Sequence, residues 1–214
     1  MRDASGPLQA LTRAQASLVT ISAAIASGDA ASTRAEAGAA IRAGLSHAAL
    51  YEALLQSYLF LGFPRAIEAF FATRSLFEQA GARRNPSSAV DAADWESAGE
   101  RLCRKVYGKN YDKLMETMRD LSPDLASSMI LEGYGKTLSR AGLGTVEREY
   151  CVVASLTVTR MERQLRSHAI GAVNVGGTRA GVREAITLTR PWAGEEAVSR
   201  ALRVTNLTEM HDRE

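Results

Sequence analysis

Apolar side chains recur every three or four residues along most of the chain, which is the spacing of one face of an α-helix. The pattern predicts helices at residues 11–26, 32–43, 47–61, 64–79, 92–106, 111–120, 123–134, 145–158, 162–175, 179–189 and 193–204. Residues 152–158 come nearest to a strand, but their apolar side chains fit a buried helix equally well. The sequence therefore predicts an all-α fold.

Glycine, proline and serine mark several of the expected helix ends. The Ser46 hydroxyl can accept an otherwise unpaired N–H in the first turn of the helix that follows it. Gly62 breaks this helix, and Pro64 suits the first turn of the next one. Residues 81–88 are polar and rich in helix breakers, so we expect a linker there, and we expect residues 205–214 to form a frayed tail.

An internal repeat relates the two ends of the chain at an offset of 132 residues, with nine identities over 36 positions and no gap. The identical pairs are Arg34/Arg166, Ala37/Ala169, Ala40/Ala172, Gly44/Gly176, Ala48/Ala180, Glu52/Glu184, Ala53/Ala185, Gly62/Gly194 and Ala69/Ala201. The glycine pairs fall where helices are expected to end, which abundant alanine does not explain. A period this long favours duplication of a domain-sized unit over a solenoid. Coincidence between two alanine-bearing helical stretches is the alternative.

Charge and cysteine content narrow the class of protein. The 214 residues include 26 Lys and Arg against 24 Asp and Glu, a net charge of +2, which argues against a nucleic-acid partner. The longest uncharged stretch, residues 14–28, is too short and too polar for a membrane span, and the N-terminus lacks the layout of a signal peptide. We therefore expect a cytoplasmic protein with no membrane partner. Cys103 and Cys151 are too few for a disulfide scaffold or a four-thiolate metal site.

Residues 99–201 resemble the carboxymuconolactone decarboxylase family, in the all-helical superfamily that includes the AhpD-like alkylhydroperoxidases. The order and spacing of short motifs carry the resemblance: Gly133-Tyr134-Gly135, Arg148-Glu149-Tyr150, Leu165-Arg166-Ser167-His168 and Asn174-Val175-Gly176-Gly177-Thr178. A partial copy near residues 9–75 better keeps the family's closing run, at residues 54–64. The resemblance implies an AhpD-like helical bundle with tandem units: a degenerate partial copy at 1–80, a linker at 81–91 and a complete domain at 92–214.

The same resemblance implies a candidate site and argues against dithiol peroxide reduction there. In AhpD-like peroxidases, a glutamate is followed by a Cys-x-x-Cys pair and then by a histidine. The resemblance places the glutamate at Glu149 and the histidine at His168. The two cysteine positions then fall on Met161 and Gln164, so both thiols are absent. Because dithiol peroxide reduction needs a reactive thiolate and a resolving partner, an alkylhydroperoxidase is disfavoured.

The resemblance to the thiol-free branch of the family implies a decarboxylase-like reaction, which needs no metal or redox cofactor. As carbon dioxide leaves, a positioned acid must deliver a proton to carbon. His168 suits that role because the ordinary histidine pKa is near neutrality, and Glu149 can orient its ring. Arg148 is the nearest candidate in the sequence to hold a substrate carboxylate. We therefore expect a cofactor-independent lyase or proton-transfer enzyme, whose partner is a small carboxylated lactone or ring acid.

Less specific interpretations of the same residues stay open. His168 is alternatively a buried structural histidine, Glu149 a solvated helix charge and Arg148 part of a charged face. In the N-terminal copy, Ser17 and Glu36 align with the two site positions, so any chemistry belongs to the second copy. The alternative function is a non-catalytic oligomeric or ligand-binding protein on the same scaffold. Because family members assemble as trimeric or hexameric rings, the resemblance also implies a homo-oligomer.

Overall fold

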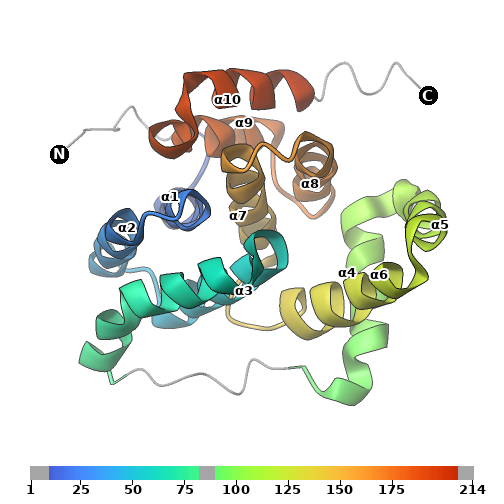
Figure 1. The fold of residues 1–214 in the computed structure, drawn as a ribbon, viewed down its shortest axis with the longest axis horizontal. Helices are drawn as coiled ribbons and strands as arrows, with labels where there is room; N and C mark the ends of the chain where they lie inside the picture. The colour runs from blue at the N-terminus through green and yellow to red at the C-terminus, as the bar shows by residue number, and fades with distance from the viewer. Residues whose placement is uncertain (1–9, 82–89, 207–214) are drawn as a thin grey trace.

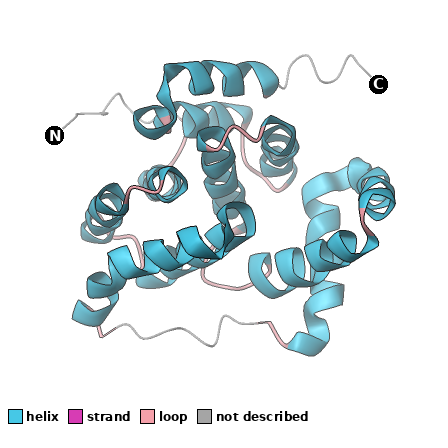
Figure 2. Cartoon of the chain, viewed as in Figure 1, coloured by secondary structure: helices cyan, strands magenta, loops and turns pink. Residues whose placement is uncertain are grey.

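The computed structural model describes residues 10–81 and 90–206, and its regular elements there are all helical (Figure 2). In chain order they are α1 Arg13–Ser27, α2 Ala30–Arg42, α3 His47–Gln79, the 3₁₀ turn η2 Ala92–Asp94, α4 Trp95–Tyr107, the 3₁₀ turn η3 Gly108–Asn110, α5 Tyr111–Leu121, α6 Pro123–Ser128, the π-helix η4 Met129–Leu138, α7 Thr145–Val158, α8 Glu162–Asn174, α9 Arg179–Leu188 and α10 Arg190–Val204. The all-α fold is confirmed. Most of the predicted linker, and the tail beyond residue 206, lie outside the described residues.

Helices α1 and α7 pack against each other and form the centre of the fold (Figure 1). Every side chain of α7 from Arg148 to Thr157 is buried. Val19 of α1 shares a core with Val152 and Val153 of α7, and all three are at most 1 % exposed. Because α1 is rich in alanine, its backbone can approach a neighbouring helix closely. The contact joins the two predicted copies, so the boundaries at residues 80 and 92 do not separate independent cores.

The 132-residue repeat is visible in the helix boundaries. Helices α1, α2 and α3 begin at residues 13, 30 and 47, and α7, α8 and α9 begin at residues 145, 162 and 179. Both repeats also contain the same kink: Gly62 has φ 79° and ψ 164°, and Gly194 has φ 80° and ψ 164°. Only glycine adopts this conformation readily. We call α1–α3 the first repeat and α7–α10 the second repeat.

An approximate twofold relation connects the two repeats. Gln15 Nε2 donates to Glu147 Oε1 at 2.8 Å, and these two positions are equivalent in the repeat. Equivalent positions face each other only near a twofold axis. Farther from the axis, Glu184 accepts the backbone N–H groups of Ala10 and Leu11, which precede α1. Its equivalent, Glu52, accepts from the Arg148 guanidinium near the start of the second repeat, so each repeat contacts the start of the other.

Helix α4 and the π-helix η4 pack at very close range. A Cβ at Gly99 would lie 2.2 Å from the Ile130 carbonyl oxygen, and one at Gly135 would lie 2.1 Å from that of Trp95. Glycine is therefore required at both positions. The sequence predicted an α-helix over residues 123–134, whereas the structure has α6 followed by a π-helix that extends to Leu138. The wider turn is closed by a bond from Ser139 N–H to the Tyr134 carbonyl at 3.0 Å.

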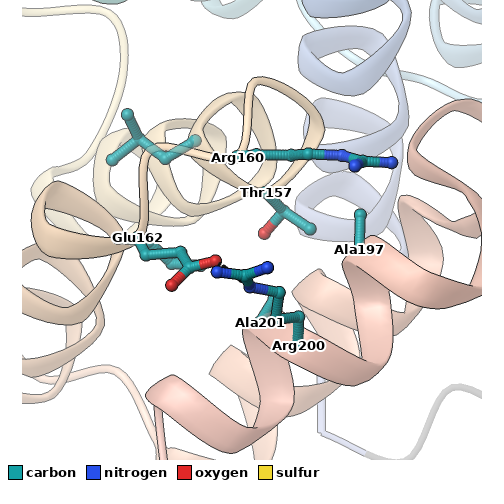
Figure 3. Close-up of a pocket in the computed structure, with 8 residues that line it drawn as sticks. Thr157, Arg160, Glu162, Ala197, Arg200 and Ala201 are labelled. Carbon is teal, nitrogen blue, oxygen red and sulfur yellow. Dashed lines mark ion pairs between the residues drawn. The ribbon is translucent and has the colours of Figure 1, made fainter.

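The turn between α7 and α8 reverses the chain and positions the candidate site. Arg160 occupies the left-handed region of the backbone there, with φ 59°, and it is the one non-glycine residue with positive φ in the described part of the chain. Its equivalent in the first repeat is Gly28, with φ 80°. Figure 3 shows Arg160 beside a small hollow that it lines together with Ala197 and Ala201 of α10.

Candidate functional site

The structure brings Glu149 and His168 into direct contact. Glu149 lies in the second turn of α7 and His168 in the second turn of α8, and the short turn between these helices makes them antiparallel neighbours. His168 Nδ1 lies 2.8 Å from Glu149 Oε2. Both residues are buried, at 2 % and 6 % exposure for Glu149 and His168. Since a carboxylate only accepts hydrogen bonds, Nδ1 carries the hydrogen and Nε2 is left for another partner.

A glycine on α8 makes room for this carboxylate. A Cβ at Gly171 would lie 3.1 Å from Glu149 Oε2 and 2.7 Å from Val106 Cγ1. Any larger residue at this position therefore has to displace the carboxylate or α4. In the first repeat, where no such carboxylate is present, the equivalent residue is Ala39.

The negative charge of Glu149 affects the pKa values of three side chains from α4 and η4. Burial, with the negative charge of Glu149 as a second cause, raises the pKa of Cys103 to about 12. Burial also raises the pKa of Tyr107 to about 12 and that of Tyr134 well above its ordinary value. The two tyrosine rings meet edge-on with centroids 6.3 Å apart. All three groups therefore keep their protons at neutral pH. Sequence reasoning missed them because no pattern indicated which helix packs on α8.

The first repeat also contributes to the site. The ring of Phe60, from α3, meets the His168 ring edge-on with centroids 5.3 Å apart. This contact gives the imidazole an apolar wall and restricts its orientation. The candidate site is therefore shared between both repeats and α4.

Arg148 makes its contacts elsewhere. Its guanidinium binds Glu52 Oε2 at 3.0 Å, Gln56 Oε1 at 3.1 Å and the Arg140 carbonyl at 2.9 Å. The side chain is 2 % exposed, and burial lowers its pKa. The structure thus brings together Glu149 and His168 of the three expected site residues, while Arg148 is held by α3 of the first repeat.

The two cysteines lie in separate clusters of buried residues. Cys151 packs with Leu18 and Ala53, whereas Cys103 packs with Tyr134 and its neighbours. Both thiols are free, and burial raises the pKa of Cys151 to about 11. Protonated thiols in separate clusters cannot form the reactive pair that dithiol peroxide reduction requires.

Comparison with known proteins identifies the family. The model of the carboxymuconolactone decarboxylase family matches residues 2–75 and 124–207, which is more than half of the chain. The chain belongs to the carboxymuconolactone decarboxylase family. The two matched segments also confirm the tandem copies that the sequence predicted. The predicted boundaries of these copies stay a prediction.

One curated relative extends the comparison. Peroxisomal protein 2 of Schizosaccharomyces pombe is 30 % identical over 137 residues, which cover 64 % of each of the two chains. The chain therefore matches less than two thirds of the length of this relative.

The described residues contain neither a cluster of metal-binding side chains nor a helix suited to a membrane. No group of three or more His, Cys, Asp and Glu side chains is arranged there to hold a metal ion. No helix within residues 10–81 and 90–206 is long and apolar enough to cross a bilayer.

Proposed function

We propose that this protein is a cofactor-independent lyase or proton-transfer enzyme that acts on a small carboxylated lactone or ring acid. The buried 2.8 Å contact between Glu149 and His168 carries the proposal. It orients an imidazole whose second nitrogen, Nε2, is available to hold a proton. Membership of the carboxymuconolactone decarboxylase family supports the reaction class.

In the proposed reaction, the residues of the site have the following roles. When the C–C bond to the departing carboxylate breaks, its electron pair moves into the conjugated ring. His168 then donates the Nε2 proton to the ring carbon, and Glu149 stabilises the imidazolium form that precedes this transfer. Cys103, Tyr107 and Tyr134 stay neutral because their pKa values are raised, so they add no negative charge beside the carboxylate.

Substitution of His168 by glutamine tests this proposal. The amide can still reach Glu149 but cannot transfer a proton, so we expect carbon dioxide release from 4-carboxymuconolactone and related ring acids to fall by about 10²–10⁴-fold. Glu36→Gln is the matched control, since Glu36 is the equivalent residue in the first repeat. The control should keep full turnover, and both variants should keep their helical circular dichroism. Unchanged turnover in His168→Gln contradicts the proposal.

A non-catalytic binding protein is the second candidate function. One observation favours it: the first repeat carries neither site residue, with Ser17 and Glu36 at the equivalent positions. If the wild-type protein releases no carbon dioxide from a panel of lactone acids and ring acids, this second function replaces the first.

We also propose that copies of this chain associate through the outer face of α3 beyond its kink. Phe63, Ile67 and Phe71 are 66 %, 49 % and 62 % exposed and follow each other at helical spacing. The equivalent residues of α10 are Glu195, Ser199 and Arg203. The apolar face therefore belongs to the first repeat alone, and an exposed face of this kind indicates a contact surface.

Light scattering tests this association. Phe63→Glu combined with Phe71→Arg gives α3 the residues that α10 carries, and we expect the mass to fall from a trimer or hexamer to one chain. Arg203→Ala is the control on the equivalent face and should leave the mass unchanged. A single-chain mass for the wild type contradicts the proposal. The cytoplasmic location is likewise a proposal; the fission-yeast relative is named as a peroxisomal protein.

A further inference from the structure

A cleft of about 590 Å³ lies between α4, the end of η4 and the start of α7. This volume is within the range of roughly 300–1,000 Å³ that is typical of small-molecule sites. Neither Glu149 nor His168 lines it, so it is distinct from the candidate catalytic site.

Positive charge dominates the lining of the cleft. Arg101 and Lys105 extend from α4, Arg140 follows η4, and Asp94 is the one carboxylate among the lining residues that the structure describes. Serine and threonine hydroxyls and leucine side chains complete the surface: Ser97, Ser139, Thr145, Leu102, Leu138 and Leu143. The lining thus combines cations and hydroxyls, which suit an anionic head group, with an apolar surface for a carbon skeleton.

Glu52 holds the guanidinium of Arg140, which lines the cleft. Its Nε lies 3.0 Å from both carboxylate oxygens of Glu52, and its Nη2 lies 2.9 Å from Oε1. Glu52 also binds the buried Arg148, so two guanidinium groups share this carboxylate. Arg140 therefore has a fixed position in the lining of the cleft, close to the cations of α4.

The equivalent positions of the first repeat carry no arginine. The residues equivalent to Arg140 and Arg148 are Leu8 and Ala16 in the sequence. Glu184, the equivalent of Glu52, is satisfied by two backbone N–H groups instead. The arginines are therefore specific to the side of the molecule that contains the cleft.

We propose that this cleft binds a small organic dianion whose phosphate group or paired carboxylates contact Arg101, Lys105 and Arg140. Arginine pairs with phosphate and carboxylate through two parallel hydrogen bonds, and the lysine adds a mobile point charge. The proposal does not depend on decarboxylase activity, since its ligand and its test are independent of Glu149 and His168.

Trp95 provides a reporter beside the cleft. It begins α4, and its indole Nε1 donates to the carbonyl of Val90, a lining residue, at 3.0 Å. The chain has two tryptophans, and Trp192→Phe leaves Trp95 as the sole emitter. Phenylalanine is a conservative choice there, because Phe60 occupies the equivalent position of the first repeat.

The experiment is a fluorescence titration of this Trp192→Phe protein with inorganic pyrophosphate and, separately, with succinate at matched ionic strength. We expect saturable binding of at least one of them, and the preferred probe distinguishes a phosphate ligand from a dicarboxylate. Adding Arg101→Ser and Lys105→Ala should raise the Kd by about tenfold or more. Adding Lys113→Ala and Arg119→Ser, which removes two exposed charges from α5, should leave the Kd within about twofold.

Two results overturn the proposal. One is the absence of saturable binding of either probe by the wild-type cleft. The other is equal weakening in the two double variants, which assigns the binding to overall surface charge. All four substituted residues are exposed, so circular dichroism should show the same helical content in both double variants.

Discussion

The first and second repeats share their helix boundaries and their kinks but carry different side chains at equivalent positions. Glu149, His168 and Gly171 of the second repeat correspond to Ser17, Glu36 and Ala39 of the first. The carboxylate, the imidazole and the space that the carboxylate needs are therefore absent together from the first repeat. The backbone of this fold therefore persists without the site, whereas the site requires several matched residues at once.

The first prediction, with the largest expected effect, concerns the two equivalent glutamates. Glu52→Gln leaves Arg140 and Arg148 without the carboxylate that they share, and breaking a buried ion pair costs about 3–5 kcal/mol of unfolding free energy. Glu184→Gln retains an oxygen that can accept from the Ala10 and Leu11 N–H groups, so we expect a loss of about 1 kcal/mol. Urea denaturation of both variants measures the difference. Equal losses contradict the assignment of a special role to the arginine pairs.

The second prediction concerns Gly171 and its equivalent, Ala39. Gly171→Ala places a methyl group against Glu149 and Val106, so we expect a loss of about 1–3 kcal/mol and lower turnover. In an unconstrained helix the same change stabilises by about 1 kcal/mol, so the sign of the effect is diagnostic. Ala39→Gly should cost about 1 kcal/mol without any change in turnover. Full turnover in Gly171→Ala means that the carboxylate position does not matter.

The third prediction uses pH. Cys103 has an ordinary pKa of 9.0 that rises to about 12 in the folded protein. Between these values the unfolded thiol loses its proton while the folded one keeps it, so the folded state binds more protons and stability falls as pH rises from 9 to 12. Cys103→Ala should reduce this slope, as measured by urea denaturation at several pH values. An unchanged slope contradicts the assignment to Cys103.

The fourth prediction, with the smallest expected effect, concerns the equivalent turns at Gly28 and Arg160. Arg160→Gly should stabilise the protein by about 1 kcal/mol, because a left-handed conformation is strained for arginine. Its ion pair with Glu196, at 3.8 Å and exposed, contributes little. Gly28→Ala should destabilise by about 1–2 kcal/mol. Thermal melting compares the two variants, and the same sign of effect in both contradicts the prediction.

The two equivalent turns also differ in where their neighbouring arginine comes from. In the first repeat, the Arg65 guanidinium occupies the space where a Cβ of Gly28 would lie. In the second repeat, the arginine is at position 160 of the turn itself and the residue equivalent to Arg65 is Ala197, on the facing helix (Figure 3). An arginine thus lies on the facing helix, at Arg65, in the first repeat and in the turn itself, at Arg160, in the second.

Much of the fold could be predicted from the sequence because local signals agree with the final packing. Helix α7 was predicted with its observed bounds, and the kink at Gly62 followed from the glycine and the nearby proline. The π-helix could not be predicted, since the spacing of its apolar residues also fits an α-helix, and its close contact with α4 forms only in the folded chain. The spacing of apolar residues in the sequence does not show which helices will pack together.

The candidate site was predictable only in part. The family resemblance placed Glu149 and His168 at the candidate site, and the structure shows that they are in contact. The contacts of Arg148 with Glu52 and Gln56 were not foreseeable, because they depend on how one repeat lies across the other. Phe60 was missed for the same reason: it lies 108 positions before His168 in the sequence.

The contact of Phe60 with His168 has a consequence for how the site depends on dilution. A side chain that belongs to the same polypeptide is present at a fixed effective concentration, set by the chain and not by the amount of protein. This part of the site therefore forms at any protein concentration, including those at which an association of separate chains comes apart. Because both repeats belong to one chain, this contact forms when the chain folds and does not require association with another chain.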